Sequence, residues 1–211
     1  MARVGIDPAG FPFVWGALAA ALIAGAGVAW WVATPFLVLA GFFLFFFRDP
    51  DRRSSTDPDV VLSPADGRVL IAGPALAAAA PPGDWRQVSI FLSPMDVHVN
   101  RVPASGRVTR VTFTAGQFLP AYRQDAGAVN ERSEIWIDHD GQAIVARQVV
   151  GILARRVVCR LEIGTTVRAG ERYGIMKFGS RMDVFLPLTA ELRVKVGDAV
   201  RGGETLIAVL H

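Results

Sequence analysis

An uncharged run from Phe11 to Phe47 limits what this chain can fold into more than any other feature of its sequence. Its first part, Pro12 to Ala33, has the length of one helix that crosses a bilayer. Thr34-Pro35 interrupts the run, and because proline is favoured in the first turn of a helix, we expect a second helix at about 35–47. This helix is short for a complete crossing. The sequence therefore predicts an N-terminal helical membrane anchor whose second helix crosses or lies partly embedded.

The charges on either side of this run predict its orientation. Arg48, Arg52 and Arg53 follow it, whereas Arg3 alone precedes it. Basic residues are retained on the cytoplasmic side, so the rest of the chain should face the cytoplasm from the inner membrane. A secretory signal peptide is the rival interpretation, but the run is long for one and no convincing small-residue cleavage site follows it.

Beyond the anchor, at 1–47, the sequence changes character. After a basic linker at 48–59, residues 60–211 contain short alternating or β-branched runs, most of them separated by Gly, Pro or Asp-Gly. They include no convincing long amphipathic helix. We therefore predict a mainly β domain, a flattened β-sandwich or barrel-sandwich, behind the anchor. The predicted strands are Val69–Ala72, Val88–Leu92, Val108–Thr114, Glu134–Ile137, Ile144–Val150, Val157–Ile163, Arg172–Phe178, Val184–Leu186, Leu192–Val196 and Thr205–Leu210.

Composition argues against some classes of function. The net charge is +3 and the basic residues are mostly Arg, which suits an anionic membrane surface or a phosphate-bearing ligand. No basic stripe interleaved with aromatic residues indicates nucleic-acid binding. The lone Cys159 cannot form an internal disulfide and is expected to be a structural buried thiol. His139 lies in an Asp-Gly hairpin turn with no further His or Cys to complete a ligand set, so no metal site is predicted.

The pair Gly179-Ser180 carries the most specific chemistry. Gly-Ser in a β-rich chain is usually a turn. However, the Ser180 hydroxyl can attack the carbonyl of Gly179 through a five-membered ring, and glycine tolerates the distorted backbone that this requires. Removal of the Ser180 Cα proton would then expel the ester and leave dehydroalanine, which hydrolyses to a pyruvoyl group. Such a group forms a Schiff base with an amine and accepts electrons, as pyridoxal phosphate does.

Self-cleavage needs a general base, and the sequence offers two candidates. Asp66 lies in the turn Ser63-Pro-Ala-Asp-Gly67, where Asp-Gly is also common for backbone reasons alone. His98 lies in a segment whose alternation places Asp96, His98 and Asn100 on one face of a strand. A carboxylate, an imidazole and an amide on one face are expensive to bury for stability alone. His98 is therefore a stronger candidate than a lone histidine would be.

Five motifs occur in a fixed order along the chain. They are Phe45-Phe-Phe-Arg-Asp-Pro-Asp51-Arg, Ser63-Pro-Ala-Asp-Gly-Arg-Val69, Phe91-Leu-Ser-Pro-Met-Asp-Val-His-Val-Asn-Arg101, Asn130-Glu-Arg132 and Lys177-Phe-Gly-Ser-Arg181. Together they resemble the phosphatidylserine decarboxylases, and most closely the short, archaeal-type branch of that family. Each motif is weak by itself, whereas five in the right order, over nearly the whole chain, are highly specific.

The resemblance implies a pyruvoyl-dependent lyase that converts phosphatidylserine in the bilayer to phosphatidylethanolamine and carbon dioxide. It implies self-cleavage between Gly179 and Ser180 into a β subunit, 1–179, and an α subunit, 180–211, that stay together non-covalently. This pair could associate further into a homodimer. The pyruvoyl group derived from Ser180 would be the cofactor. Asp66 and His98 match residues assigned to a serine-protease-like set that drives maturation.

One position departs from the family pattern. Arg101 stands where the longer enzymes carry a second His, three residues after the one that His98 matches. The division of roles between Asp66 and His98 is therefore open, and His98 is expected to act as the base in maturation and as the proton donor in turnover. For substrate binding the candidates are Arg101, Asn130, Glu131 and Lys177. Asn130 and Glu131 sit in a predicted loop, where a solvated role is the alternative. Lys177 lies in the predicted strand Arg172–Phe178, and its alternative is an ordinary exposed or phosphate-facing lysine.

A function of another class competes. Val194-Lys-Val-Gly-Asp198-Ala-Val-Arg-Gly-Gly203-Glu-Thr-Leu206 has the turn pattern of biotinyl and lipoyl carrier domains, and Met176-Lys177 lies at a plausible distance before the C-terminus. Carrier domains flank their modified Lys with a second Met, which is missing here. The alternative is therefore a membrane-anchored carrier or interaction module without catalysis, in which Gly179-Ser180 is only a turn.

Overall fold

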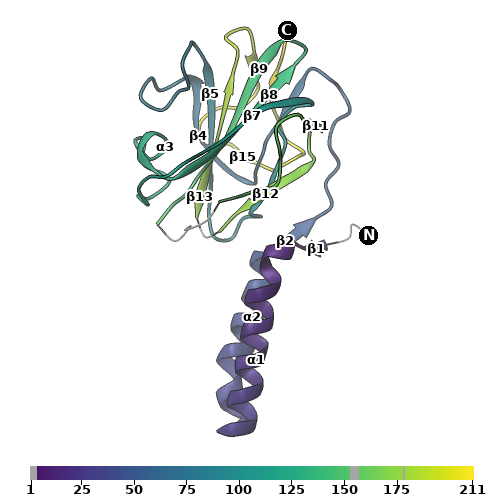
Figure 1. Cartoon of the computed structure of the whole chain (residues 1–211), viewed down its shortest axis with the longest axis vertical. Helices are drawn as coiled ribbons and strands as arrows, with labels where there is room; N and C mark the ends of the chain where they lie inside the picture. Colours follow the sequence, from purple (N-terminus) through teal and green to yellow (C-terminus); the bar gives the residue numbers. More distant parts are fainter. Residues whose placement is uncertain (1–3, 153–156, 178) are drawn as a thin grey trace. The chain divides into compact units, whose positions relative to one another are not determined.

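The computed structural model describes residues 4–152, 157–177 and 179–211. The chain divides into two compact units, one ending at Asp51 and one comprising Arg52–His211. Figure 1 shows that the long helices belong to the first unit and nearly all the strands to the second.

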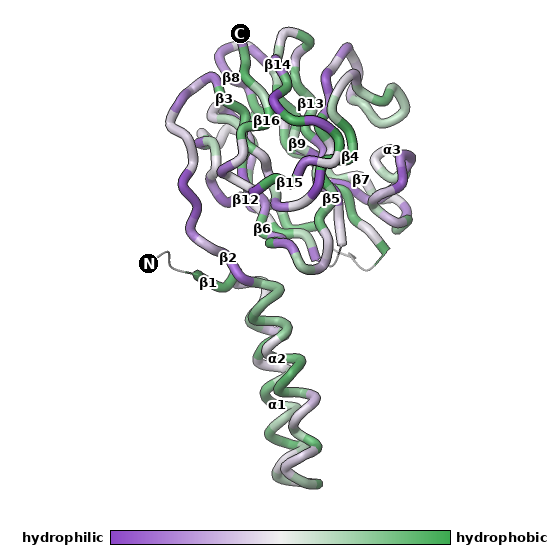
Figure 2. The backbone as a smooth tube through the Cα atoms, turned by 180° about the vertical axis from the view of Figure 1, so that it is seen from behind, coloured by the Kyte–Doolittle hydropathy of each residue, from purple (hydrophilic) through white to green (hydrophobic). Residues whose placement is uncertain are grey.

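The first unit is a helical hairpin with a short strand at each end. Strand β1 pairs antiparallel with β2, and helix α1 packs against α2 through small buried side chains such as Ala17, Ala21 and Ala40. Larger apolar side chains, including Leu22 and Ile23, point outward, and both helices are coloured mostly as hydrophobic in Figure 2. The elements are β1 Val4–Ile6, the 3-10 turn η1 Pro8–Gly10, α1 Phe11–Gly27, η2 Trp30–Ala33, α2 Thr34–Phe46 and β2 Arg48–Pro50.

The helical segment Pro8–Gly27 is long and apolar enough to cross a bilayer, by length and composition. The first helix nevertheless ends at Gly27, six residues before the predicted end. Gly25 and Gly27 lower helix propensity there, and Trp30–Ala33 forms a separate 3-10 turn. The second helix begins at Thr34 with Pro35 in its first turn, as the restart signal predicts.

The second unit is built on one curled antiparallel sheet of eight strands, in the order β11-β7-β8-β9-β13-β5-β4-β15. Two three-stranded sheets, β10-β12-β6 and β14-β16-β3, complete it. The one helix described in this unit is α3, Ala126–Val129. The strands are β3 Val60–Leu62, β4 Gly67–Pro74, β5 Arg86–Leu92, β6 Val99–Arg101, β7 Gly106–Thr114, β8 Arg132–His139, β9 Gln142–Val149, β10 Val157–Cys159, β11 Thr166–Val167, β12 Arg172–Met176, β13 Ser180–Leu186, β14 Glu191–Leu192, β15 Ala199–Val200 and β16 Leu206–Val209.

The prediction of a mainly β fold is confirmed. Alternating apolar side chains of the large sheet meet those of the smaller sheets in one core, to which β13 contributes Met182, Val184 and Leu186. Strand β13 lies between β5 and β9, and all seven of its residues are buried. It begins at Ser180, four residues before the predicted strand. The residue pair predicted to react therefore stands where this central strand starts.

Candidate active site

The backbone at Gly179 has a conformation that suits glycine. Its φ angle is +69°, a region that residues with a Cβ rarely adopt. Nothing lies within 4 Å of the place where a Cβ would stand, so the requirement comes from the backbone and not from a lack of space. The neighbouring peptide bond is therefore held in a geometry that other residues would adopt only under strain.

The Ser180 hydroxyl is buried among apolar groups. Ser180 pairs with Leu92 of β5, and by the two-residue period of a strand it shares the core-facing side of β13 with Met182 and Val184. Its side chain is completely buried, and its Oγ has no hydrogen-bond partner among the described residues. A buried polar group left without a partner costs about 1–3 kcal/mol. The unpaired hydroxyl therefore lowers stability, and it lies next to Gly179, whose φ angle is positive.

His98 belongs to the chain segment that runs opposite the Gly179-Ser180 bond. Leu92 pairs with Ser180, Val99 pairs with Ile175, and the His98 carbonyl accepts a hydrogen bond from the Met176 amide at 3.3 Å. The imidazole is completely buried, and its Nδ1 lies 2.9 Å from the Asp96 carbonyl oxygen. A carbonyl oxygen can only accept, so Nδ1 carries the proton and Nε2 is left as the basic nitrogen.

Asp66 makes its described contacts with another part of the domain. One carboxylate oxygen accepts a hydrogen bond from Arg52 at 2.8 Å, and the other accepts one from the Gly202 amide at 2.7 Å. The Arg52 side chain is nearly buried and also reaches Glu204, at 3.4 Å. Asp66 therefore connects Arg52, in the linker, to the turn near Gly202. This turn belongs to the predicted α subunit.

The candidate substrate-binding residues are spread over the domain. Arg101 is buried and donates from Nη1 to the Gly170 carbonyl at 3.1 Å. Asn130 is completely buried and binds main-chain groups of Leu119 and Val150. Glu131 and Lys177 are each half-buried, Glu131 directly before β8 and Lys177 directly after β12. Lys177 is thus the candidate nearest in sequence to Ser180.

Gly151 and a small pocket border the predicted cleavage bond. A Cβ placed on Gly151 would overlap the carbonyl oxygen of Gly179, so the backbone at 151 lies directly against the bond. A pocket of about 360 Å³ opens beside the same glycine. Its other lining residues are apolar or aromatic: Phe91, Pro94, Pro120, Ala121, Tyr122 and Ile152. The pocket therefore gives an apolar surface beside Gly179.

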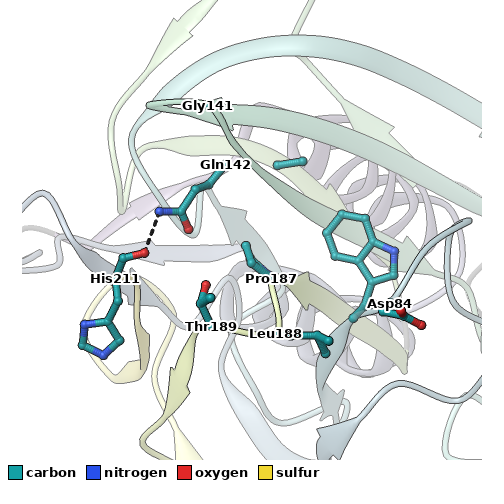
Figure 3. Close-up of a pocket in the computed structure, with 9 residues that line it drawn as sticks. Asp84, Gly141, Gln142, Pro187, Leu188, Thr189 and His211 are labelled. Atoms are coloured by element: carbon teal, nitrogen blue, oxygen red, sulfur yellow. Dashed lines mark hydrogen bonds between the residues drawn. The ribbon is translucent and has the colours of Figure 1, made fainter.

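A larger cavity, of about 510 Å³, lies elsewhere in the domain (Figure 3). Asp84, Pro187, Leu188 and His211 line it, and Gln142 donates from Nε2 to the His211 carbonyl at 3.0 Å across one side. None of the candidate site residues lines this cavity. We therefore place no step of the chemistry there.

Known proteins resemble this chain over nearly all of its length. The family model described as phosphatidylserine decarboxylase matches residues 39–208. The chain belongs to the phosphatidylserine decarboxylase family. A phosphatidylserine decarboxylase proenzyme from Gluconacetobacter diazotrophicus is 44% identical to it, over 96% of this chain and 93% of that protein. Proteins of the same name from Geotalea daltonii and Nocardia farcinica are 43% and 41% identical, over 98% and 97% of this chain and 97% and 87% of theirs.

Membership of the phosphatidylserine decarboxylase family confirms the resemblance inferred from the five motifs. Assignment of the chain to the short, archaeal-type branch of that family stays a prediction. The relatives are named proenzymes, which are processed after synthesis. A non-catalytic carrier module is not favoured by these relationships. The individual roles of Asp66, His98, Arg101 and the loop residues stay predictions.

Sequence reasoning missed the buried polar network beside the site. Arg181 and Asp183 are completely buried on the face of β13 opposite Ser180, joined at 2.6 Å. Ser89 bridges them, donating to Asp183 at 2.5 Å and accepting from Arg181 at 3.0 Å. Arg181 also donates to the Arg123 carbonyl at 3.1 Å. The one local signal was an arginine and an aspartate two residues apart, which share a strand face.

Burial also sets the character of the single thiol. Cys159, at the end of β10, is half-buried rather than fully enclosed. Burial raises the pKa of its thiol, partly offset by hydrogen bonds to the Leu161 main chain and Ser133. A thiol with a raised pKa is a poor nucleophile at neutral pH. The expected full burial is therefore not found, and the structural role stays a prediction.

Proposed function

We propose that this chain decarboxylates phosphatidylserine to phosphatidylethanolamine and carbon dioxide, using a pyruvoyl group that it makes from its own Ser180. The observation that carries the proposal is the bond between Gly179 and Ser180 in a member of this family. Gly179 has a positive φ angle, and the Ser180 hydroxyl is buried without a described hydrogen-bond partner. Both observations support a bond that can react. The products would be a β subunit, 1–179, and an α subunit, 180–211.

Maturation begins with Ser180 in this proposal. Its Oγ attacks the carbonyl carbon of Gly179, and the bond to the Ser180 nitrogen breaks, so that an ester replaces the amide. Loss of the Ser180 Cα proton then expels the Gly179 carboxylate and leaves a carbon–carbon double bond at position 180. Water adds to the tautomeric imine and ammonia leaves, giving the ketone. Every step uses groups of this chain and water, so the atoms balance without an oxidant.

The residues around position 180 fit a pyruvoyl group. The buried site lies among the apolar side chains of the core, and the group formed there would lose the serine hydroxyl that now lacks a described partner. When present, a pyruvoyl group supplies a ketone carbonyl that condenses with the substrate amine and withdraws electrons as carbon dioxide leaves. The surrounding apolar residues exclude water from that reaction.

His98 is the residue we assign to proton transfer. The contact between its Nδ1 and the Asp96 carbonyl leaves Nε2 as the acceptor, and the segment that carries it runs opposite the reacting bond. As a base it would accept protons during maturation, and as an acid it would return one to the substrate Cα. Asp66 would support maturation by fixing the turn at Gly202. Lys177, the binding candidate nearest in sequence to Ser180, would attract the anionic head group.

The apolar helices would hold the enzyme at the bilayer, where its substrate lies. The acyl chains of phosphatidylserine stay in the bilayer, so the enzyme has to work at its surface. The helices of the first unit would anchor it, and the arginines after them, Arg48, Arg52 and Arg53, place the catalytic domain on the cytoplasmic side in this proposal.

Purified full-length protein and lipid test the function directly. Mass spectrometry should find a fragment that begins at position 180 with a pyruvoyl group. Phosphatidylserine labelled in its carboxyl group should release labelled carbon dioxide, and hydroxylamine, which reacts with ketones, should stop the release. An intact chain bearing biotin or lipoate on Lys177 would support the carrier alternative instead.

Replacement of Gly151 by alanine is expected to slow self-cleavage by roughly 100-fold or more, because misplacing a reacting atom by about 1 Å has an effect of that size. The new Cβ would displace the Gly179 carbonyl. The cut fraction can be followed on gels after synthesis. Gly174→Ala is a matched control, because its Cβ would meet a main-chain carbonyl, that of Val158, just as closely. Equal slowing in both variants would mean that only general packing is disturbed.

Replacement of Asp66 by alanine is expected to lower the unfolding free energy by about 1–3 kcal/mol, since Arg52 and the Gly202 amide both lose an acceptor. Self-cleavage should slow as well. Thermal unfolding and the cut fraction are the two measurements. Glu204→Ala removes the weaker partner of Arg52 and should leave cleavage unchanged. If the Asp66 variant cleaves at the normal rate, Asp66 takes no part in maturation.

A further inference from the structure

We propose that the side-chain amide of Asn100 binds the carboxylate of the serine head group, and that Gln148 positions this amide. The inference rests on the proposed function, because it takes the substrate to be phosphatidylserine and its amine to react at position 180. It adds a specificity-determining residue for the group that leaves as carbon dioxide. Neither residue is one of the catalytic or binding candidates predicted from the sequence.

Gln148 faces the same interior space as Ser180. It lies on β9 as the pairing partner of Met182, and paired residues of neighbouring strands point to the same side of a sheet. Ser180 precedes Met182 by two residues on β13, so it points to that side as well. Gln148 is thus a diagonal neighbour of Ser180, at a separation that a long side chain can span. Both side chains are buried.

Asn100 reaches this space from another sheet. It belongs to β6, and its Oδ1 accepts a hydrogen bond from Gln148 Nε2 at 2.8 Å. Both side chains are buried, so the pair connects β6 to β9 inside the domain. Gly174 pairs with Asn100 from β12, and a Cβ on that glycine would come within 2.9 Å of Gln148 Nε2. The neighbouring strand therefore leaves room for the amide pair.

Hydrogen bonds fix the orientation of both amides. Gln148 Nε2 also donates to the Val158 carbonyl, at 3.3 Å, and a carbonyl oxygen can only accept. Gln148 therefore presents its nitrogen to Asn100, and Asn100 presents its oxygen in return. The Asn100 nitrogen, Nδ2, lies at the other end of its amide. It is buried and has no hydrogen-bond partner among the described residues.

A serine carboxylate suits this donor. A buried donor without a partner lowers stability, and a carboxylate supplies two acceptor oxygens. The amine and the carboxylate of serine are attached to the same carbon, so an amine held at position 180 brings the carboxylate into the space that Gln148 and Asn100 share. Gln148 Oε1 also lacks a described partner, but it is an acceptor and cannot bind a carboxylate.

A neutral donor also suits a carboxylate that has to be lost. The charged side chains Arg147, Arg181 and Asp183 of β9 and β13 lie on the opposite face of the sheet. An arginine would hold the carboxylate more strongly, through charge-assisted hydrogen bonds. That attraction weakens as negative charge leaves the carboxylate, so it would stabilise the bound substrate more than the transition state. An amide selects the head group with less of this effect.

Self-cleavage leaves the pair in place in this proposal. Asn100, Gln148 and Val158 all belong to the predicted β subunit, on β6, β9 and β10. The hydrogen bonds that orient the two amides join only these three residues, and neither Gly179 nor Ser180 takes part in them. The same donor is therefore available to the processed enzyme.

Two Asn100 variants test the proposal on the full-length, processed protein. Asn100→Asp keeps an oxygen for Gln148 Nε2 and loses the donor, whereas Asn100→Ala loses both. The probes are glycerophosphoserine, isotope-labelled in its glycerol, and unlabelled glycerophosphoethanolamine, which lacks only the carboxylate. Cyanoborohydride fixes each bound amine to position 180, and the mass of the α subunit gives the ratio of the two adducts independently of turnover. We expect both variants to lower the serine-to-ethanolamine ratio by roughly tenfold or more.

Gln87→Glu is the matched control. It also changes a buried amide to an acid, and it keeps an acceptor, here for the Leu76 amide at 3.0 Å. Gln87 pairs with Phe185, so it lies on the face of the large sheet opposite Ser180. The control should keep the wild-type ratio. In turnover, kcat/KM for phosphatidylserine should fall roughly tenfold or more in the Asn100 variants only, with inhibition by phosphatidylethanolamine unchanged.

Gln148→Met tests the positioning role. Methionine fills a similar space but cannot hold the Asn100 amide. The adduct ratio should fall in this variant, and Gln148→Met should add nothing in an Asn100→Ala background, because no amide is left to orient. A full additional fall in the double variant would show that Gln148 acts independently of Asn100, and that would overturn its positioning role.

The remaining outcomes separate this proposal from the proposed function. An unchanged ratio in both Asn100 variants would overturn the proposal and leave the amide pair as a structural connection between the sheets. Uncut Asn100 variants would also overturn it, because they would place the amide in maturation. Wild-type protein that forms no adduct with either amine would contradict the proposed function instead.

Discussion

Replacement of Ser180 by alanine is expected to leave the chain as one uncut polypeptide of 211 residues without decarboxylase activity. Alanine has no hydroxyl to attack the Gly179 carbonyl and cannot become a ketone. Loss of a covalent catalytic group commonly lowers kcat by about 10⁶-fold, so carbon dioxide release should fall below detection. Intact-mass measurement and release of labelled carbon dioxide check the two parts of this result separately.

The fold should survive this substitution. Ser180 Oγ has no described partner, so its removal relieves a buried polar group and should leave the unfolding temperature the same or slightly higher. Ser133→Ala, at another buried serine within a strand, is the matched control and should still be cut. Two fragments from the Ser180 variant, or lipid turnover by an uncut chain, would contradict the proposed origin of the cofactor.

The sequence predicts most of the large sheet because its strands obey simple alternation. Strands such as β5 and β7 have apolar residues directed toward one core and turn residues at their ends, and both are local properties. The start of β13 breaks this rule. Its first residues, Ser180 to Asp183, look like a polar turn, so the sequence predicts a strand only from Val184.

The reason lies in contacts that are distant along the chain. Arg181 and Asp183 are stable inside the protein because Ser89, 92 residues before Arg181, bridges them, and because the Arg123 carbonyl, 58 residues before it, accepts a further hydrogen bond. Local sequence cannot show that a buried ion pair has found these partners. The same applies to Gly151, since its need for glycine comes from the Gly179 carbonyl lying against it.

The motifs predict which segments lie together better than they predict individual contacts. The segment that carries His98 runs opposite the one that carries Gly179 and Ser180, because the strands that flank them pair. Asn130 belongs to a motif that suggests head-group binding, yet its amide binds the Leu119 and Val150 main chain. A motif indicates that a residue type is needed at a position. Only the contacts in the folded protein show whether that residue can bind the substrate or instead holds the main chain in place.

Replacement of His98 by alanine is expected to give the second-largest effect, a self-cleavage rate lower by roughly 10²- to 10⁴-fold, the usual contribution of a general base. The alanine variant should accumulate as uncut chain because no other described imidazole is placed opposite the Gly179-Ser180 bond. Time courses of the cut fraction after synthesis measure the effect. Added imidazole should restore part of the rate, which a purely structural defect would not allow.

His139 provides the matched control for this experiment. Its side chain is also buried, and its Nδ1 lies 2.8 Å from a main-chain carbonyl, that of Ser105, just as His98 Nδ1 lies 2.9 Å from the Asp96 carbonyl. The two alanine variants lose the same group and a similar contact, but only His98 belongs to the segment opposite the reacting bond. Normal cleavage in the His139 variant with slow cleavage in the His98 variant would identify a base. Normal cleavage in both would transfer that role to Asp66 or to another group.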